Sequence, residues 1–213
     1  MKKINVLLVD DHAVVRAGFR MLLASANSIE IVAEAERGET ACQLYLEKQP
    51  DVVVLDLSMP GIGGLECIRR ICNRDSLAKI LVFSVHDESV YVSRAIEAGA
   101  KGYITKNSAP EILVDAIQKI AAGDIYIEPG LEKTPRIHGN ELDYKNLINT
   151  LTPKEFDIFC LLAKGLTTHK IAGELCLGYK TVANYGTQIK SKFHAATVAE
   201  LAHIATALGI IKN

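Results

Sequence analysis

The sequence VLLVDDH at residues 6–12 and the sequence VVVLD at residues 52–56 decide the fold class of this chain. In each, a short run of valine and leucine is followed directly by aspartate. The second run is apolar at four successive positions, which is typical of a central strand buried on both faces of a parallel sheet. The two stretches therefore predict strands of a parallel α/β sheet, with acidic residues where the strands end.

The first 120 residues alternate between two hydrophobic periodicities. Short β-branched runs predict strands, and between them apolar residues recur at the i, i+3, i+4 and i+7 spacing of amphipathic helices. Five strands alternating with five helices form repeated βαβ units, which predict an α/β doubly wound parallel sheet with helices on both faces. If the strand order is flavodoxin-like, 2-1-3-4-5, the first, third, fourth and fifth strands lie side by side. The predicted strands are Ile4–Val9, Ile29–Ala33, Val52–Leu55, Ile80–Phe83 and Gly102–Ile104.

Charge is distributed unevenly along the 213 residues, of which 49% are apolar and 23% charged. This composition is that of an ordinary globular protein and excludes collagen-like, disordered and coiled-coil classes. Residues 1–144 carry 16 Lys and Arg against 21 Asp and Glu, whereas residues 145–213 carry 8 against 4. An acidic first part and a basic second part indicate two domains with different partners. The basic part suits nucleic acid, although a charge of this size is equally common on an ordinary solvated surface.

The start of the chain and its cysteines predict where the protein works. The apolar run after Met1 is too short for a signal peptide, and no stretch approaches the roughly 18 to 20 apolar residues that span a bilayer. The five cysteines contain no C-x-x-C pair, so we expect neither a zinc site nor a secreted disulfide framework. We expect a cytoplasmic protein without a membrane partner, in which the cysteines serve as small hydrophobic residues.

The stretch Ala122–Asn149 breaks the alternating pattern with glycines, prolines and mixed charges. We interpret residues 123–147 as a linker between a domain at 1–122 and a second domain at 148–213. A purely helical pattern resumes at Leu151, and residues 152–155 form a predicted capping box with proline at the first helical position. The second domain is therefore predicted to be small and all-α.

Five polar side chains follow the predicted strands at their carboxyl ends. Asp10 and Asp11 follow the first strand and Asp56 the third, while Ser84 follows the fourth and Lys106 lies just beyond the fifth. In a parallel sheet of the expected order these positions converge at the edge where ligands bind. Three converging carboxylates repel one another and normally need a hard cation, for which Mg²⁺ is the natural choice. A carboxylate beside Mg²⁺, a lysine and a hydroxyl predicts phosphoryl transfer.

The stretches VLLVDDH, VVVLDLSMPGIGG, ILVFSVHD and AGAKGYITK, within residues 3–122, resemble the receiver domain of bacterial two-component response regulators. By this resemblance Asp56 accepts a phosphoryl group from a sensor histidine kinase, and Lys106 contacts the phosphoryl oxygens. The resemblance also implies that Asp11 and Asp56 bind Mg²⁺ directly, together with the backbone carbonyl of Ser58. Asp10 would act on the metal through water.

The same resemblance implies a switch built from two further residues. Ser84 and Tyr103 would form this pair, the hydroxyl moving to the phosphoryl group and the ring turning inward. Asn107 stands where many receivers have proline, which leaves the local turn geometry open. Our hypothesis for His86 and Ser58, which border the predicted pocket, is that they tune hydrolysis of the aspartyl phosphate. Both could equally be ordinary loop residues.

Residues 148–211 resemble the LuxR-type helix-turn-helix domain of regulators of the NarL/FixJ class. The resemblance implies a recognition helix from about Thr181 to Phe193. This helix follows a turn at Cys176–Tyr179, in which we expect Gly178 to supply a permissive φ. The framework residues that carry the resemblance are Leu151, Thr152, Glu155, Leu161, Leu162, Gly165, Ile171, Ala172, Leu175, Thr181, Val182, Ile189 and Lys192.

The predicted recognition helix has an inward and an outward face. At 100° per residue the inward face is mostly apolar, whereas the outward face is a polar strip flanked by lysines. Such a strip suits the major groove of double-stranded DNA. The inward residues are Val182, Tyr185, Gly186, Ile189 and Phe193. The predicted DNA-contacting residues are Lys170, Lys180, Thr181, Ala183, Asn184, Thr187, Gln188, Lys190, Ser191 and Lys192.

Departures from the family pattern bear on DNA readout. The family commonly has lysine at the position of Ala183 and histidine at that of Tyr185, and an interior glycine such as Gly186 costs about 1 kcal/mol relative to alanine. We expect an A·T-leaning readout, with Asn184 bidentate to adenine. The methyl groups of Ala183 and Thr187 would then contact the thymine methyl.

These features together predict a transcription regulator and not an enzyme. Phosphorylation of Asp56 would control sequence-specific DNA binding. The resemblance implies that it frees the recognition helix or promotes a homodimer, which would read two half-sites. Two alternatives are a phosphorylation-independent DNA-binding protein and a regulator whose altered recognition helix binds a protein. A third is a Mg²⁺-dependent phosphohydrolase, for which Leu57 and Ser58 after Asp56 supply no general acid.

Overall fold

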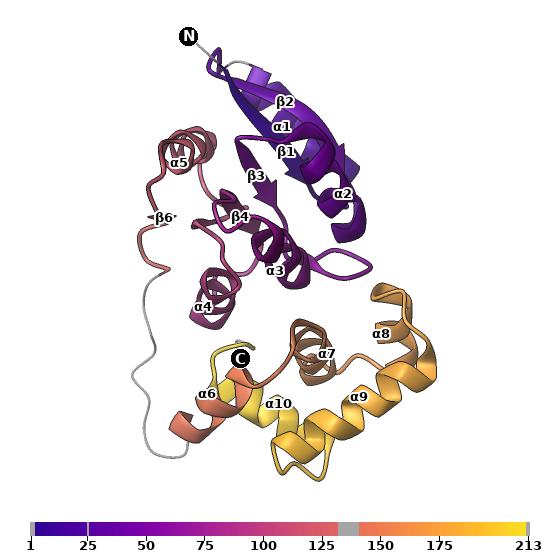
Figure 1. The fold of residues 1–213 in the computed structure, drawn as a ribbon. Coiled ribbons are helices and arrows are strands. Elements are labelled where there is room, and N and C mark those ends of the chain that lie inside the picture. The colour runs from indigo at the N-terminus through magenta and orange to yellow at the C-terminus, as the bar shows by residue number, and fades with distance from the viewer. Residues whose placement is uncertain (1–2, 25, 132–140, 212–213) are drawn as a thin grey trace. The chain divides into compact units, whose positions relative to one another are not determined.

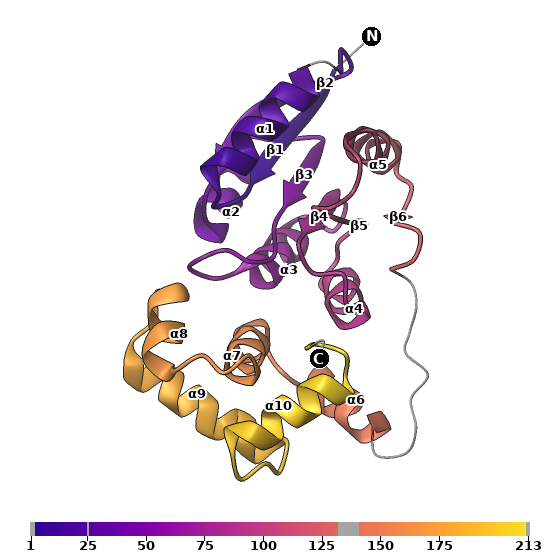
Figure 2. The same cartoon turned by 180° about the vertical axis from the view of Figure 1, so that it is seen from behind.

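The computed structural model of the chain describes residues 3–24, 26–131 and 141–211. These residues divide into two units, which we call the sheet unit and the helical unit. The sheet unit consists of the parallel sheet and the helices around it, and the helical unit consists of the helices after residue 140 (Figures 1 and 2).

The sheet has the order β2-β1-β3-β4-β5-β6, and every neighbouring pair runs parallel. The first five strands have the flavodoxin-like order 2-1-3-4-5, which confirms the predicted doubly wound fold class. β3 is buried at all four positions, as its unbroken apolar run predicts. The strands are β1 (Ile4–Val9), β2 (Ile29–Ala35), β3 (Val52–Leu55), β4 (Ile80–Ser84), β5 (Gly102–Thr105) and β6 (Tyr126–Ile127).

The sixth strand lies in the stretch that the sequence indicates to be a linker. Tyr126 pairs with Gly102, and the N–H of Glu128 donates to the carbonyl of Tyr103 at 2.9 Å. A strand of two residues is too short to show a hydrophobic period, so the prediction of five strands is wrong by one. Residues 132–140 of the predicted linker lie outside the described residues, and the domain limits at 122 and 148 stay a prediction.

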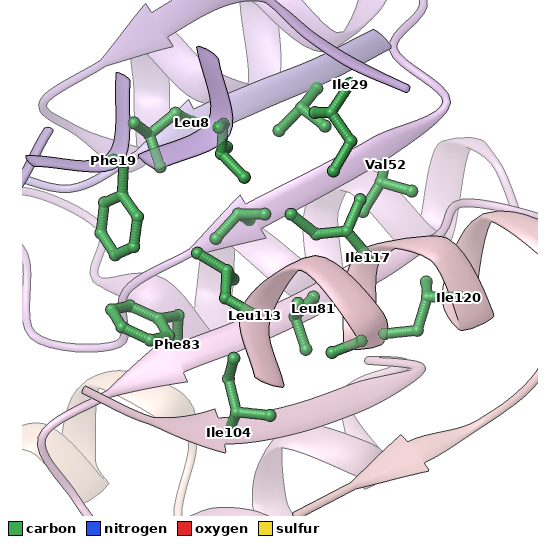
Figure 3. Packing of buried hydrophobic residues seen from close by; sticks show 14 residues of the cluster. Leu8, Phe19, Ile29, Val52, Leu81, Phe83, Ile104, Leu113, Ile117 and Ile120 are labelled. Carbon is green, nitrogen blue, oxygen red and sulfur yellow. The ribbon is translucent and has the colours of Figure 1, made fainter. Parts of the chain in front are cut away.

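One face of the sheet is covered by the first and fifth helices, which form a continuous core with alternate strand residues (Figure 3). The rings of Phe19 and Phe83 meet edge to face, with centroids 4.7 Å apart. Ile117 and Ile120 are fully buried against the same face. The remaining three helices lie on the opposite face (Figures 1 and 2). The helices are α1 (Ala13–Ala24), α2 (Gly38–Lys48), α3 (Gly64–Arg74), α4 (Ser89–Glu97) and α5 (Pro110–Ala122).

The helical unit contains no strand within its described residues, which agrees with the all-α prediction. The predicted capping box is present: Thr152 Oγ1 accepts from the N–H of Glu155, whose carboxylate accepts from the N–H of Thr152. Its first helix begins at Glu141, within the predicted linker and before the helical pattern that resumes at Leu151 in the sequence. The limits of the linker stay a prediction. The helices are α6 (Glu141–Asn149), α7 (Pro153–Ala163), α8 (Thr168–Glu174), α9 (Tyr179–Lys192) and α10 (Val198–Ala207).

The turn between α8 and α9 differs from the prediction. Gly178 has φ −70° and serves as the N-cap of α9, a conformation open to any residue, whereas Cys176 has φ +52°. The N–H of Leu177 donates to the carbonyl of Ala172 and that of Cys176 to Gly173, which is the Schellman pattern that ends a helix. The left-handed position therefore belongs to the end of α8, and the expectation for Gly178 is wrong.

Candidate functional site

The acidic residues predicted to converge do so at the carboxyl edge of the sheet. Asp10 follows β1 and Asp56 follows β3, and these strands are neighbours in the sheet. Asp10 is 1% exposed and Asp56 2%, so both carboxylates are removed from solvent. Together with Asp11 and His12 they bring four possible ligand atoms within 4.8 Å of one another. The strand order alone explains this convergence, since the ends of adjacent parallel strands meet at one edge.

Lys106 completes the charge balance of this pocket. Its Nζ lies 2.6 Å from Asp10 Oδ2 and 2.7 Å from Asp56 Oδ2. The backbone holds the lysine there, because its N–H donates to the carbonyl of Ser84 at the end of β4. Burial raises the pKa of the Asp56 carboxyl, although the ammonium group of Lys106 opposes this shift. Burial also disfavours the lysine's charge, but the two carboxylates outweigh it and raise the pKa of Lys106.

The donor set of the pocket fits a hard cation. Asp11 Oδ1 is buried and accepts no hydrogen bond from any described residue, although His12 Nδ1 lies 2.8 Å away. An oxygen atom without a hydrogen bond, beside two further carboxylates, is the kind of ligand that Mg²⁺ prefers. The sequence did not single out His12 as part of this cluster. Its backbone N–H donates to Asp10 Oδ1 at 2.7 Å just before α1 begins, as expected of a helix-start residue.

The loop after β3 packs tightly beneath the carboxylate of Asp56. The N–H of Ser58 donates to Asp56 Oδ1 at 3.3 Å, and the Ser58 hydroxyl lies 3.0 Å from His86 Nε2. A Cβ at Gly64 would come within 2.4 Å of the carbonyl of Asp56, so this close approach requires glycine. The described contacts do not involve the carbonyl of Ser58, and its role as a metal ligand stays a prediction.

The two residues predicted to form a switch are both buried at the neighbouring strands. Ser84 is fully buried at the end of β4, and its hydroxyl accepts a hydrogen bond from the N–H of His86. Tyr103 on β5 is also fully buried, and its hydroxyl donates to the carbonyl of His86 at 2.8 Å. The His86 ring stacks on Tyr91 with centroids 3.9 Å apart. The loop between β4 and α4 is thus held by both residues of the predicted pair.

Arg16 is a residue of this site that the sequence analysis missed. It is 8% exposed, and its Nη1 donates to the backbone carbonyl of Asp10 at 2.6 Å. Its guanidinium group also pairs with Glu34 and Glu36 at the end of β2. Burial of a guanidinium is costly unless it is paired, so these contacts lock the junction between β1 and α1. The one feature of the sequence that could have indicated this role is the position of Arg16 between the apolar residues of the first predicted helix.

In the helical unit, α9 presents the predicted faces. Val182, Ile189 and Phe193 are buried, whereas Tyr185 and Gly186 are half-buried. Among the predicted DNA-contacting residues, the exposed ones are Lys170, Lys180, Thr181, Asn184, Thr187, Gln188 and Ser191, and the half-exposed ones are Ala183, Lys190 and Lys192.

Lys192 has a structural partner in addition to its predicted contact with DNA. Its Nζ lies 2.8 Å from both carboxylate oxygens of Glu155, which is 5% exposed at the start of α7. Burial alone would raise the pKa of the Glu155 carboxyl, but hydrogen bonds from Lys192 and Thr152 outweigh it and hold the pKa below its usual value. The pair ties the end of α9 to the start of α7.

An aromatic pair that the sequence analysis did not single out lies at the start of α9. The rings of His169 and Tyr179 stack with centroids 4.4 Å apart, and Tyr179 is 49% exposed. Lys170 and Lys180 follow these two residues in the chain and are both exposed. The exposed surface at the start of α9 is therefore basic and aromatic.

Comparison with known proteins identifies both units. The model of the response regulator receiver domain matches residues 6–118, and that of the luxR family of bacterial regulatory proteins matches residues 149–205. Because the first match spans more than half of the chain, this protein belongs to the two-component response regulators with a LuxR-type DNA-binding domain. That family consists of transcription regulators and is not a class of enzymes. Across the described residues, no helix is both long and apolar enough to cross a membrane.

Two relatives match the chain over nearly its whole length, and a solved structure matches part of it. The chain is 38% identical over 210 residues to the transcriptional activator protein ExaE of Pseudomonas putida, covering 98% of both. It is 36% identical to the response regulator UvrY of Escherichia coli, covering 97% of this chain and 95% of that protein. A LuxR-family two-component response regulator from Aurantimonas is 44% identical with a TM-score of 0.59, covering 61% of this chain and 93% of the other.

Replacement of Asp56 by asparagine is expected to stabilise the sheet unit in metal-free buffer. Because the folded-state pKa of this carboxyl is raised, its ionised form destabilises the folded state at pH values above that pKa. Asparagine keeps the size of the side chain without its charge, so we expect the thermal midpoint to rise by a few degrees at neutral pH. The gain should shrink as the pH falls through the raised pKa, because the wild-type carboxyl then binds a proton. Asp124→Asn, at an exposed position, is the control, and an unchanged or lower midpoint for Asp56→Asn at neutral pH contradicts the prediction.

Replacement of Lys192 by methionine is expected to lower the free energy of unfolding of the helical unit by about 1–3 kcal/mol, because a buried carboxylate loses its partner. The folded-state pKa of Glu155 is lowered, so the contribution of the pair is present above the ordinary carboxyl value of 4.5 and is lost as the pH falls through the folded-state pKa. Urea unfolding at neutral and acidic pH measures both effects. Lys190→Met on the same helix is the control, and an equal loss in the two variants would refute the assignment.

Proposed function

We propose that Asp56 is the phosphoacceptor and that its phosphorylation by a sensor histidine kinase controls DNA binding by the helical unit. The observation that supports this most directly is the buried carboxylate of Asp56 at the end of β3, with Lys106 Nζ at 2.7 Å. A buried carboxylate with a fixed cation beside it is a nucleophile that already has a partner for the incoming phosphoryl oxygens.

Transfer of the phosphoryl group to Asp56 needs few groups besides Asp56 and Lys106. One Asp56 Oδ atom attacks phosphorus as the P–N bond of the kinase phosphohistidine breaks, and the released imidazole nitrogen takes up a proton. Lys106 can leave Asp10 to pair with the phosphoryl oxygens, since its ammonium already lies between the two carboxylates. Asp11, Asp56 and the carbonyl of Ser58 would hold Mg²⁺, with Asp10 acting through water. When bound, the metal supplies charge neutralisation for the phosphoryl group.

The switch that reports phosphorylation would use Ser84 and Tyr103. The Ser84 hydroxyl lies at the end of β4, adjacent in the sheet to both β3 and β5, and accepts a hydrogen bond from the N–H of His86. A phosphoryl group on Asp56 would attract this hydroxyl and release that N–H. Because the Tyr103 hydroxyl is bonded to the carbonyl of His86, the change would reach the loop before α4 and the inward ring together.

For DNA, we propose that the exposed strip of α9 enters the major groove. Asn184 is exposed in the middle of the strip, and an asparagine can bond adenine through two hydrogen bonds. The Thr187 hydroxyl donates to the backbone carbonyl of Ala183, which directs its hydrogen bond inward and leaves its methyl group for thymine. Phosphorylated chains would pair as homodimers on two half-sites about one helical turn apart, in the bacterial cytoplasm.

A selection from random duplex DNA tests the coupling of the two units. The full-length protein is expected to enrich paired half-sites in the presence of Mg²⁺ and beryllofluoride, and much less without them. Asp56→Asn, which lacks the acceptor carboxylate, should enrich paired half-sites only weakly, both with and without Mg²⁺ and beryllofluoride. If Asp56→Asn responds to beryllofluoride as the wild type does, Asp56 is not the acceptor. If strong enrichment is independent of beryllofluoride, DNA binding is not controlled by this pocket.

A second experiment tests whether Asn184 recognises adenine. With the selected site in hand, Asn184→Ala is expected to weaken binding by about 1–3 kcal/mol and to relax the preference for adenine at one position per half-site. Ser191→Ala, on the same exposed strip, should leave that preference intact. Selected sites that are G·C-rich at the contacted positions, or an unchanged preference in Asn184→Ala, would exclude the proposed readout.

A further inference from the structure

Two cysteines on neighbouring helices of the sheet unit bring their sulfur atoms close together. Cys42 lies on α2 and Cys67 on α3, two helices that pack against each other. Their Sγ atoms are 3.8 Å apart, although the residues are separated by 25 positions in the chain. Both cysteines are reduced in this structure. The sequence predicted only that each would serve as a small hydrophobic residue.

The surroundings hold one sulfur in place and leave the other accessible. Cys67 is fully buried, and its thiol donates to the carbonyl of Gly38 at 3.5 Å. Gly38 is itself confined, since a Cβ there would lie 3.1 Å from the Cβ of Cys67 and 2.6 Å from the Ile62 side chain. Cys42 is only partly buried. A reagent from solvent would therefore reach Cys42 first.

The environment also favours the reactive form of the accessible thiol. The side-chain hydrogen bond with Cys67 lowers the pKa of the Cys42 thiol to about 7, and the charges of Arg70 and Arg74 act in the same direction. The thiolate is the nucleophile in disulfide exchange, and a thiol with a pKa near the ambient pH is an effective attacking group. For Cys67 the same hydrogen bond, together with burial, raises the pKa, so it remains a thiol until Cys42 has reacted.

We propose that Cys42 and Cys67 form a thiol–disulfide modification site that is oxidised by low-molecular-weight disulfides such as glutathione disulfide. The proposal rests on the facing sulfur atoms and on their unequal access to solvent. It does not depend on Asp56 being the phosphoacceptor. Within the described residues no other pair of cysteine sulfurs has a contact of this kind.

The exchange is balanced by two thiol–disulfide steps. The Cys42 thiolate attacks one sulfur of glutathione disulfide, which breaks the S–S bond, forms a mixed disulfide and releases one glutathione thiolate. That thiolate takes the proton of Cys67, whose sulfur then attacks Cys42 Sγ and expels the second glutathione thiolate, which is protonated by solvent. Two protein thiols are oxidised to one disulfide while one glutathione disulfide is reduced to two glutathione molecules. The two sulfurs must approach from 3.8 Å to about 2.05 Å.

The disulfide would join two helices that border the loop after Asp56. α3 begins at the end of that loop, and the Glu39 carboxylate on α2 accepts from the N–H of Ile62 within it at 3.1 Å. A covalent tie between α2 and α3 would therefore restrict the loop that packs under the carboxylate. In a cytoplasmic environment such a bond is expected to be transient and responsive to redox conditions.

Peptide mapping of the full-length wild-type protein tests the proposal without any substitution. After incubation with glutathione disulfide and blocking of free thiols, trypsin should release peptide 38–48, which carries Cys42, linked to peptide 49–69, which carries Cys67. Dithiothreitol should restore both thiols. Peptide 71–74 carries Cys72 and should not enter the link. If Cys42 carries only glutathione, or if the linked peptides are missing while exposed Cys176 has reacted, the proposal is overturned.

Matched variants separate this pair from general thiol oxidation. Cys67→Ser should accumulate the mixed disulfide at Cys42, because the resolving sulfur is gone, whereas Cys72→Ser on the same helix should cross-link as the wild type does. The oxidised wild type should unfold at a temperature higher by at least about 5 °C than the reduced form. The reason is that the disulfide closes a loop between two residues 25 positions apart, which restricts the unfolded chain. An oxidised form that unfolds at the same or a lower temperature would show that the two sulfurs are not placed for a disulfide in the folded state.

Discussion

The repulsion between two buried carboxylates is the constraint on which the sheet unit depends. Asp10 and Asp56 lie at the ends of adjacent strands and are almost fully removed from water. Their charges are tolerable only with a cation between them, and Lys106 supplies it from beyond β5 with its Nζ within 2.7 Å of both. The order of the strands, the buried arginine behind Asp10 and the tight loop after β3 all keep these three groups in place. A phosphoryl group or a metal ion entering the pocket would change this balance of charge.

The helical unit also contains a buried carboxylate, and one ion pair neutralises its charge. Glu155 is buried because its carboxylate closes the capping box of α7, and Lys192 neutralises it from the far end of α9. The apolar side chains Val182 and Ile189 of the same helix are buried, whereas Asn184 is exposed. A residue expected to contact DNA thus also serves the stability of the surface that DNA would meet. The His169–Tyr179 stack adds an aromatic surface at the start of that helix.

Much of this architecture was predictable because it rests on periodicity and on the direction of parallel strands. The converging residues Asp10, Asp56 and Lys106 follow strands whose apolar runs are unambiguous, so their meeting point could be inferred. The strand β6 could not be predicted, because a segment of two residues shows no hydrophobic period. This strand exists only through its pairing with β5. The left-handed residue after α8 is Cys176 and not the nearby glycine, since the position is set by where the helix ends.

The sequence by itself determined the fold class and the set of polar residues that follow the strands at their carboxyl ends. Hydrophobic period and strand direction are local or topological properties, and they need no knowledge of packing. Only the tertiary structure decided which charges are paired: Arg16 with Glu34 and Glu36, and Lys192 with Glu155. It also decided that Cys42 and Cys67 face each other across two helices. These contacts depend on distances between side chains far apart in the chain, which packing sets and no single segment encodes.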